Sequence, residues 1–217
     1  MKRLLIIVTA MAFCTLSCRP APERLRSGDL VFVGIPADYS LDDSMDAAIT
    51  AATCPDSLNI IHAAIAEVRG DSVWIIDATL RHGVDRHPLD TFLKDFTLRD
   101  GSLPDFIVMR LKDDKNASRY VSNARSFVGL KYNSAFVPCD TAQYCTELIR
   151  NSFRRSDGSY IFSEAPMNFR APDGSMPVYW EQLFSILGQP VPQGVPGTNP
   201  RSMMAEPCLK QINISLK

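Results

Sequence analysis

The sequence has few histidines, and its cysteines are not spaced like the ligands of a structural metal site. The 217 residues include three histidines and six cysteines, and neither a C-x-x-C nor an H-x-x-x-H pair occurs. Structural zinc sites are usually built from ligands clustered in this way. We therefore expect no metal site, and the chemistry inferred below needs no organic cofactor.

The sequence also lacks an excess of charge of either sign. Lysine and arginine together number 23 and aspartate and glutamate 24, which gives a formal net charge of −1. The chain has neither basic blocks nor an acidic tail. Because proteins that bind nucleic acid usually concentrate basic residues on one surface, nucleic acid is not an expected partner.

Long apolar runs are missing beyond the first residues of the chain. Residues 4–13 are apolar and follow Lys2 and Arg3, but this run is too short to span a bilayer as a stable helix. With the Thr-Leu-Ser-Cys stretch that ends at Cys18, it resembles a bacterial lipoprotein signal in which Cys18 becomes the lipidated first residue. A plain secretory signal is the alternative.

This interpretation predicts the division of the chain and its location. Residues 1–17 are expected to be the signal peptide, residues 18–27 a tether, and residues 28–217 a single domain. The mature protein would be held at the bacterial cell envelope by its lipid, so the membrane is an expected partner through this anchor.

Four cysteines remain in the predicted domain: Cys54, Cys139, Cys145 and Cys208. An exported chain can form disulfides. We expect any disulfide to join Cys54 to Cys139 or Cys208 and to leave Cys145 free.

Turn residues separate β-rich runs from segments with helical periodicity. Strands are expected at residues 30–33, 60–68, 72–79 and 106–111, and helices at 42–53, 90–96, 115–128, 145–153 and 177–187. The polar residues 81–87, which include His82 and His87, and the Pro- and Gly-rich residues 189–199 are expected to be irregular. Partial segregation of strands and helices indicates an α+β fold with a mainly antiparallel sheet.

The two central strands predict a contact between a histidine and a carboxylate. A two-residue turn at Gly70 and Asp71 sets a register in which His62 and Asp77 are diagonal neighbours on one face of the sheet. Their Cβ atoms should then lie within about 7 Å of each other. The carboxylate would fix the tautomer of the imidazole. A lone histidine on an apolar strand is more often a core residue, so this pairing needs a third group to indicate catalysis.

Cys145 supplies that third group, because it lies where a helix is expected to begin. A helix N-terminus stabilises a thiolate, and an imidazole transfers the proton that thiol-based hydrolysis requires. Histidine precedes cysteine in this chain, the reverse of the order in ordinary papain-like enzymes.

Several short motifs, in their order along the chain, resemble the circularly permuted NlpC-type papain-like proteins of the YiiX and YaeF group. They are Gly28-Asp29-Leu30-Val31-Phe32, Ile61-His62-Ala63-Ala64-Ile65, Ile76-Asp77-Ala78-Thr79, Gly129-Leu130-Lys131-Tyr132, Tyr144-Cys145-Thr146-Glu147-Leu148 and Pro196-Gly197-Thr198-Asn199-Pro200. The resemblance implies a permuted papain-like core, in which the sheet packs against the helix that starts at the catalytic cysteine.

The resemblance also implies the catalytic roles. Cys145 would be the nucleophile, His62 the general base and acid, and Asp77 the group that orients the histidine. Relatives often carry glutamate at the third position, so Asp77 is a shorter side chain with less reach. Tyr144, Tyr132 and Asp29 are candidates for binding substrate, although packing or turn-capping would explain each of them equally well.

The function expected from these residues is a cell-envelope cysteine hydrolase that cleaves an amide through a thioester. Its substrate would be a peptide, such as a cell-wall stem peptide, or another amino-acid-containing or lipid amide. The alternatives are a noncatalytic module that binds peptides or lipids on the same fold, and a disulfide-stabilised interaction domain in which Cys145 is oxidised.

Overall fold

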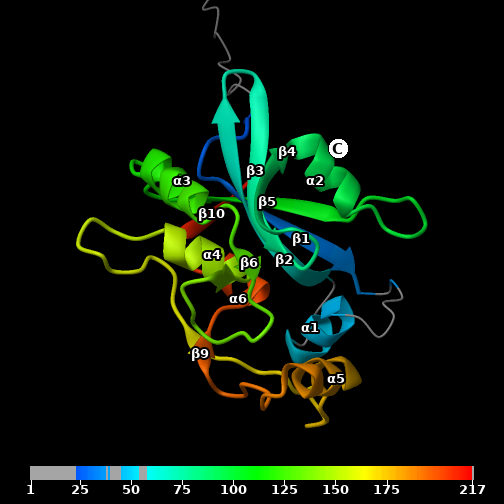
Figure 1. Ribbon diagram of the computed structural model, residues 1–217. Helices are drawn as coiled ribbons and strands as arrows, with labels where there is room; N and C mark the ends of the chain where they lie inside the picture. The colour runs from blue at the N-terminus through cyan, green and yellow to red at the C-terminus, as the bar shows by residue number, and fades with distance from the viewer. Residues whose placement is uncertain (1–22, 38, 40–44, 54–57, 217) are drawn as a thin grey trace, which may run out of the picture.

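The core of the protein is a six-stranded sheet in which every neighbouring pair is antiparallel. Figure 1 shows the computed structural model, which describes residues 23–37, 39, 45–53 and 58–216. The strands run in the order β10 (Leu209–Ile212), β5 (Asp105–Leu111), β1 (Leu30–Pro36), β2 (Leu58–Arg69), β3 (Ser72–Thr79) and β4 (Gly83–Pro88). The predicted α+β class with a mainly antiparallel sheet is confirmed.

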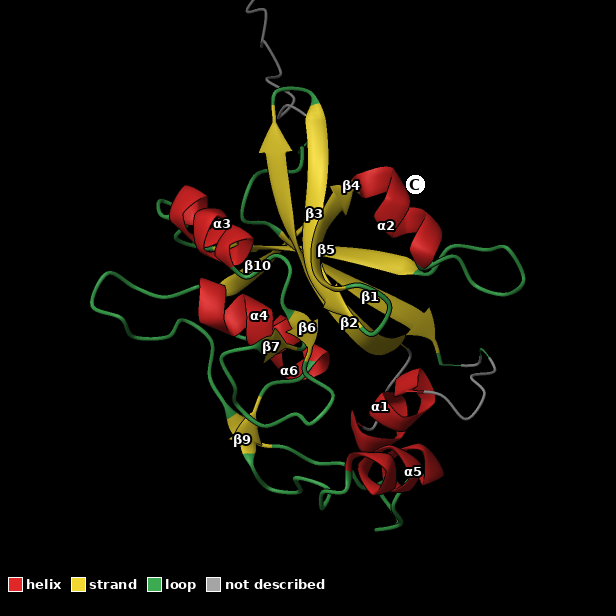
Figure 2. Ribbon diagram, viewed as in Figure 1, coloured by secondary structure: helices red, strands yellow, loops and turns green. Residues whose placement is uncertain are grey.

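Helices cover both faces of this sheet (Figure 2). On one face, α3 (Ala117–Ser126), α4 (Cys145–Ser152) and α6 (Pro200–Met204) bury their apolar side chains against alternate residues of the strands. On the other face, α2 (Leu89–Asp95) inserts Phe92 between Val31, Ala64 and Ile75. Because side chains alternate along a strand, the apolar strands fill both layers at once.

A third apolar cluster lies beside the sheet. It joins α1 (Met45–Thr53) to α5 (Val178–Leu187) through Ala48, Trp180 and Phe184. Phe136 and Tyr144 pack into the same cluster, so the residue before Cys145 is anchored there. The short pairs β6 (Lys131–Tyr132) with β7 (Ala142–Gln143) and β8 (Ala165–Pro166) with β9 (Pro196–Gly197) tie the connecting chain together.

The predicted hairpin register is confirmed. Arg69 pairs with Ser72 and Val68 with Val73, and the pairing continues to Ile65 with Ile76. Gly70 has a φ of 58°, the left-handed conformation that a tight hairpin turn requires and that glycine adopts without strain.

Apart from the two-residue strands β6 to β9, the sequence missed three elements of the fold. Residues 83–88, expected to be irregular, form strand β4, while α6 and β10 follow the predicted last helix. Strand β4 carries Asp85 and Arg86 at the edge of the sheet, where charged residues are tolerated. Its outer side bonds the connecting chain at Val84, whose backbone pairs with Gly129 and Leu130.

Much of the predicted signal and tether lies outside the described residues. Of the tether, residues 23–27 are described and contact the domain: the Ser27 hydroxyl bonds the backbone of Val68, and the Arg24 carbonyl accepts from Arg110. The folded domain therefore begins before Gly28. Among the described residues, the helices are too short or too polar to cross a bilayer.

The cysteines of the described residues form no disulfide. Cys139 and Cys208 are free thiols, while Cys54 lies outside the described residues. Cys145 is also free, as expected, and buried.

Candidate active site

His62 is positioned by an irregularity in strand β2. Val33 of β1 pairs with His62, but the next residue, Gly34, pairs with Ile60, so Ile61 is an extra residue in β2. Such a β-bulge rotates the side chains that flank it. His62 thereby faces the side of the sheet that α2 covers, where its ring lies 4.8 Å from the ring of Phe96.

Asp77 lies on the neighbouring strand and contacts His62 directly. Its Oδ2 atom is 2.8 Å from Nε2 of His62, and the exposed fraction of Asp77 is 1%. Because a carboxylate only accepts, Nε2 donates, which leaves Nδ1 for the other partner of the ring. The diagonal contact expected from the hairpin is therefore present, and the shorter aspartate reaches the histidine.

Cys145 is the first residue of α4, and it lines the same cavity as His62. Burial acts to lower the pKa of His62, but hydrogen bonds to Asp77 and to the Cys145 side chain raise it to about 10. These contacts stabilise the charged imidazolium, which is the form that accompanies a thiolate. The first backbone N–H groups of α4, including that of Cys145, have no partner within the helix.

The start of α4 is held by Tyr144 and Glu147. The backbone N–H of Tyr144 donates to the Glu147 carboxylate at 3.1 Å, and the Tyr144 hydroxyl accepts from the backbone N–H of Thr198 at 3.1 Å. Thr198 also bonds the hydroxyl of Thr146 at 2.9 Å. The C-terminal segment thus fixes the turn that presents Cys145, a supporting role that no local pattern in the sequence indicates.

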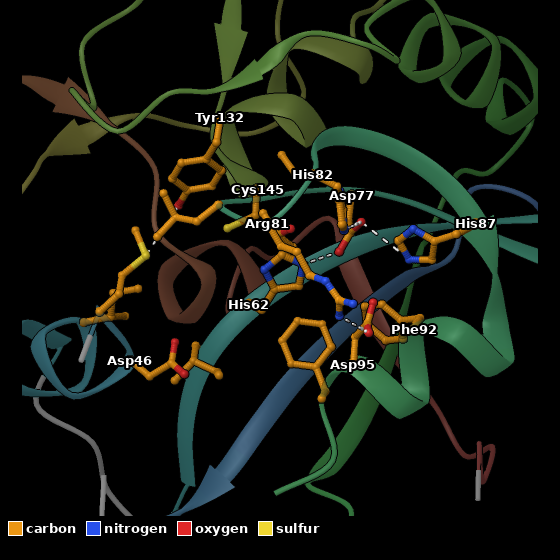
Figure 3. Close-up of a pocket in the computed structure, with 17 residues that line it drawn as sticks. Asp46, His62, Asp77, Arg81, His82, His87, Phe92, Asp95, Tyr132 and Cys145 are labelled. Carbon is orange, nitrogen blue, oxygen red and sulfur yellow. Dashed lines mark hydrogen bonds and ion pairs between the residues drawn. The ribbon is translucent and has the colours of Figure 1, made fainter. Parts of the chain in front are cut away.

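His62, Asp77 and Cys145 line one cavity of about 330 Å³ (Figure 3). Tyr132 and Asp46 also line it. A smaller apolar slot adjoins it at Cys145 and Tyr132, and its floor includes Phe136, Phe169 and Trp180. The arrangement offers a nucleophile, a proton carrier and an apolar subsite within one site.

Of the three residues predicted to bind substrate, two line the cavity or the slot and one does not. Tyr132 lines both the cavity and the slot, and Tyr144 lines the slot. Asp29 is not among the described residues that line either space. Its two carboxylate oxygens accept from Nε and Nη2 of Arg110 at 2.6 and 2.7 Å, and one also accepts from the backbone of Arg26. Asp29 therefore stabilises the domain and its turn, and it is not assigned to substrate binding.

Two residues that the sequence placed in an irregular segment also line the cavity. His87 lies on β4 and is buried, while His82 lies in the turn before that strand and is partly buried. Both face Asp77 (Figure 3). A polar strand gives no periodic hydrophobic signal, so these positions could not be assigned to the site from the sequence.

The family model of the permuted papain-like amidases, the YaeF/YiiX or C92 family, matches residues 24–213. The chain belongs to this family. The permuted papain-like amidases are hydrolases, and the permuted order agrees with the position of His62 before Cys145 in the chain.

A solved structure supports the fold assignment of this permuted papain-like protein. The crystal structure described as metalloprotein yiiX from Escherichia coli O157:H7 matches with a TM-score of 0.66 and 19% sequence identity, over 88% of this chain and 97% of yiiX. At this level of identity the likeness shows the fold alone. No curated protein matches the sequence significantly.

Proposed function

We propose that this permuted papain-like amidase is a cysteine hydrolase that cleaves an amide through a thioester on Cys145. The observation that carries the proposal is that His62 bonds Asp77 and shares one cavity with Cys145 at the N-terminus of α4, where the thiol raises the pKa of His62. The same three side chains come from three separate elements, β2, β3 and α4.

The reaction follows from the roles of these groups. The Cys145 thiolate attacks the amide carbonyl, and the protonated His62 gives its proton to the leaving nitrogen as the C–N bond breaks. His62 then accepts a proton from water, which attacks the thioester. Breakage of the C–S bond releases the carboxylic acid and restores the sulfur of Cys145. Asp77 holds the ring in the required tautomer throughout.

The oxyanion needs two hydrogen-bond donors. The unpaired backbone N–H of Cys145 supplies one. We assign the second to the Tyr132 hydroxyl, which lines both spaces beside Cys145 and makes only a weak, 3.9 Å contact with the Met45 sulfur that a substrate oxygen could replace. Burial raises the pKa of Tyr132 well above its usual value, so the hydroxyl keeps its proton.

The apolar slot supports a substrate with an apolar group next to the scissile carbonyl. The apolar residues that line it include Ile49, Phe136, Phe169 and Trp180. A stem-peptide bond with a small apolar side chain and an N-acyl amino acid both fit this description. Lipidation of Cys18 would place the enzyme at the cell envelope, where both kinds of substrate occur.

Incubation with purified muropeptides and with a series of N-acyl amino acids tests the proposal. Products identified by mass spectrometry should appear with the wild type and with Cys139→Ser, whose thiol is exposed, and not with Cys145→Ala. Trp180→Ala should shift the preference among acyl groups, and Tyr132→Phe should lower kcat by about 10² to 10³. Binding of these ligands without turnover by the wild type would favour a noncatalytic module.

A further inference from the structure

Asp77 has a second carboxylate oxygen that the proposed catalytic group does not use. Its Oδ1 atom lies 3.8 Å from Nε2 of His82 and 3.7 Å from Nε2 of His87. The three atoms lie within 4.8 Å of one another. Figure 3 shows His82 and His87 near Asp77, with His87 on the side of Asp77 that is farther from Cys145.

Strand pairing explains how these residues meet. Ile75 on β3 pairs with His87 on β4, so Asp77 and His87 are diagonal neighbours on one face. His62 reaches Asp77 from the opposite neighbour, β2. The carboxylate thus lies between two strands, with one oxygen directed to each.

Two buried polar atoms of this group face each other at 3.7 Å, too far apart for a hydrogen bond. Oδ1 of Asp77 and Nε2 of His87 are buried and have no hydrogen-bond partner, in side chains that are 1% and 8% exposed. A buried polar atom without a partner is costly, and a bound ion or water is one of the arrangements that satisfies it. Arg81, which lines the same cavity, is paired instead with Asp95 at 2.6 Å.

The Nδ1 atoms of His82 and His87, which are turned away from Asp77, both face oxygen acceptors. Nδ1 of His82 lies 2.9 Å from the carbonyl of Gly83, and Nδ1 of His87 lies 3.6 Å from the carboxylate of Asp85. A carbonyl can only accept, so Nδ1 of His82 carries a hydrogen, and in the neutral ring Nε2 then presents its lone pair. Histidines that bind metals are usually oriented by such carbonyl or carboxylate partners.

We propose that Asp77, His82 and His87 form a binding site for a divalent transition metal ion of the zinc type. Two imidazoles and one carboxylate are ligands that zinc accepts, and a fourth position would remain open to the cavity. In a tetrahedral site with bonds of about 2.0–2.1 Å, ligand atoms lie roughly 3.4 Å apart. Oδ1 of Asp77 would therefore have to approach each ring by a few tenths of an ångström, and the two rings, whose ligand atoms lie within 4.8 Å of each other, would have to turn toward each other by more. The sequence analysis expected no metal site because the candidate ligands are not clustered along the chain. It missed this site because Asp77 comes from the adjacent strand.

Metal titration of the purified, chelator-treated protein tests this site independently of the amidase reaction. We expect one Zn²⁺ per chain by elemental analysis and visible d–d absorption of a tetrahedral ion when Co²⁺ replaces it. His82→Ala and His87→Ala should each weaken binding by at least about 100-fold, because even partners outside the ligand set contribute about 10- to 100-fold. Asp85→Asn should have the smaller effect of such an outer partner, about 10-fold.

Two controls separate this site from other sources of metal binding. Asp95→Asn changes a carboxylate of the same cavity outside the cluster, and Cys145→Ser removes the sulfur that could bind zinc together with His62. Both variants should bind Zn²⁺ and Co²⁺ as the wild type does. The proposal is overturned if Cys145→Ser loses metal binding, or if the wild type binds no stoichiometric metal. It is also overturned if His82→Ala and His87→Ala bind the metal as tightly as the wild type does.

Discussion

Asp77 bonds His62 through Oδ2, with 2.8 Å between Oδ2 and Nε2, across the two strands of a hairpin whose register follows from its turn. The carboxylate is 1% exposed, so the contact is shielded from water. This relationship fixes which nitrogen of His62 faces Cys145, and the predictions about catalysis depend on it.

Asp77→Asn should lower kcat/KM by about 10² to 10⁴ while the domain remains folded. Asparagine is nearly isosteric, but it can present its N–H₂ group to His62 and stabilise the wrong tautomer, and it no longer stabilises the imidazolium. Kinetics with the best amide substrate and circular dichroism together measure the effect. Asp95→Asn is the matched control, and an unchanged kcat/KM in Asp77→Asn would remove Asp77 from the mechanism.

Asp29→Ala should destabilise the protein without altering its active site. The substitution leaves the Arg110 guanidinium buried without its carboxylate, and breaking a buried pair in this way costs about 3–5 kcal/mol. Chemical denaturation measures the loss. The double variant Asp29→Leu with Arg110→Met should recover part of the stability, since it leaves no unpaired charge.

The rate constants of the folded fraction of Asp29→Ala distinguish this interpretation from substrate binding. They should equal those of the wild type. A raised KM at full stability would instead return Asp29 to the substrate site.

Glu147 should make the protein less stable as the pH rises from about 4.5 to about 7. Burial raises the pKa of Glu147 from 4.5 to about 7, against the lowering effect of its hydrogen bonds to Asn133 and to the Tyr144 backbone. Because the folded state holds the proton more tightly than the unfolded state, the stabilisation is complete below pH 4.5 and is lost by pH 7. The change is roughly 3 kcal/mol, at about 1.4 kcal/mol for each pH unit.

Glu147→Gln isolates this effect from other titrating groups. The amide stays neutral and still offers an oxygen to the Tyr144 N–H. Thermal unfolding between pH 4.5 and 7.5 should therefore show a weaker fall in Tm for the variant than for the wild type. Parallel curves for the two proteins would show that the Glu147 carboxyl is ionised at the same pH in the folded and unfolded states.

The sequence predicted the parts of the fold whose signals are local. The Gly70–Asp71 turn and the alternating residues of two strands were enough to bring His62 and Asp77 together, and the helix start at Cys145 was visible in its own residues. Strand β4 was missed because its charged residues carry no apolar alternation. The second pair of histidine contacts to Asp77 was missed with it, since those contacts exist only when β4 pairs with β3.

Other assignments failed because a residue type alone does not reveal its partner. Asp29 resembled a site residue in the sequence, but its carboxylate pairs with Arg110, which lies 81 residues away. Thr198 supports the turn before Cys145 across 54 residues. Such long-range hydrogen bonds depend on the finished fold, so local patterns could not show them.

The rate at which iodoacetamide labels Cys145 near neutral pH tests the central claim most directly. Mass mapping of the labelled peptides reports Cys145 and the exposed Cys139 in the same sample, so Cys139 serves as an internal reference for an ordinary thiol. We expect Cys145 to react faster than Cys139 although it is buried, and to slow by at least about tenfold in His62→Ala while Cys139 is unchanged. If Cys145 reacts no faster than Cys139, or at the same rate with and without His62, the two residues do not form a catalytic pair.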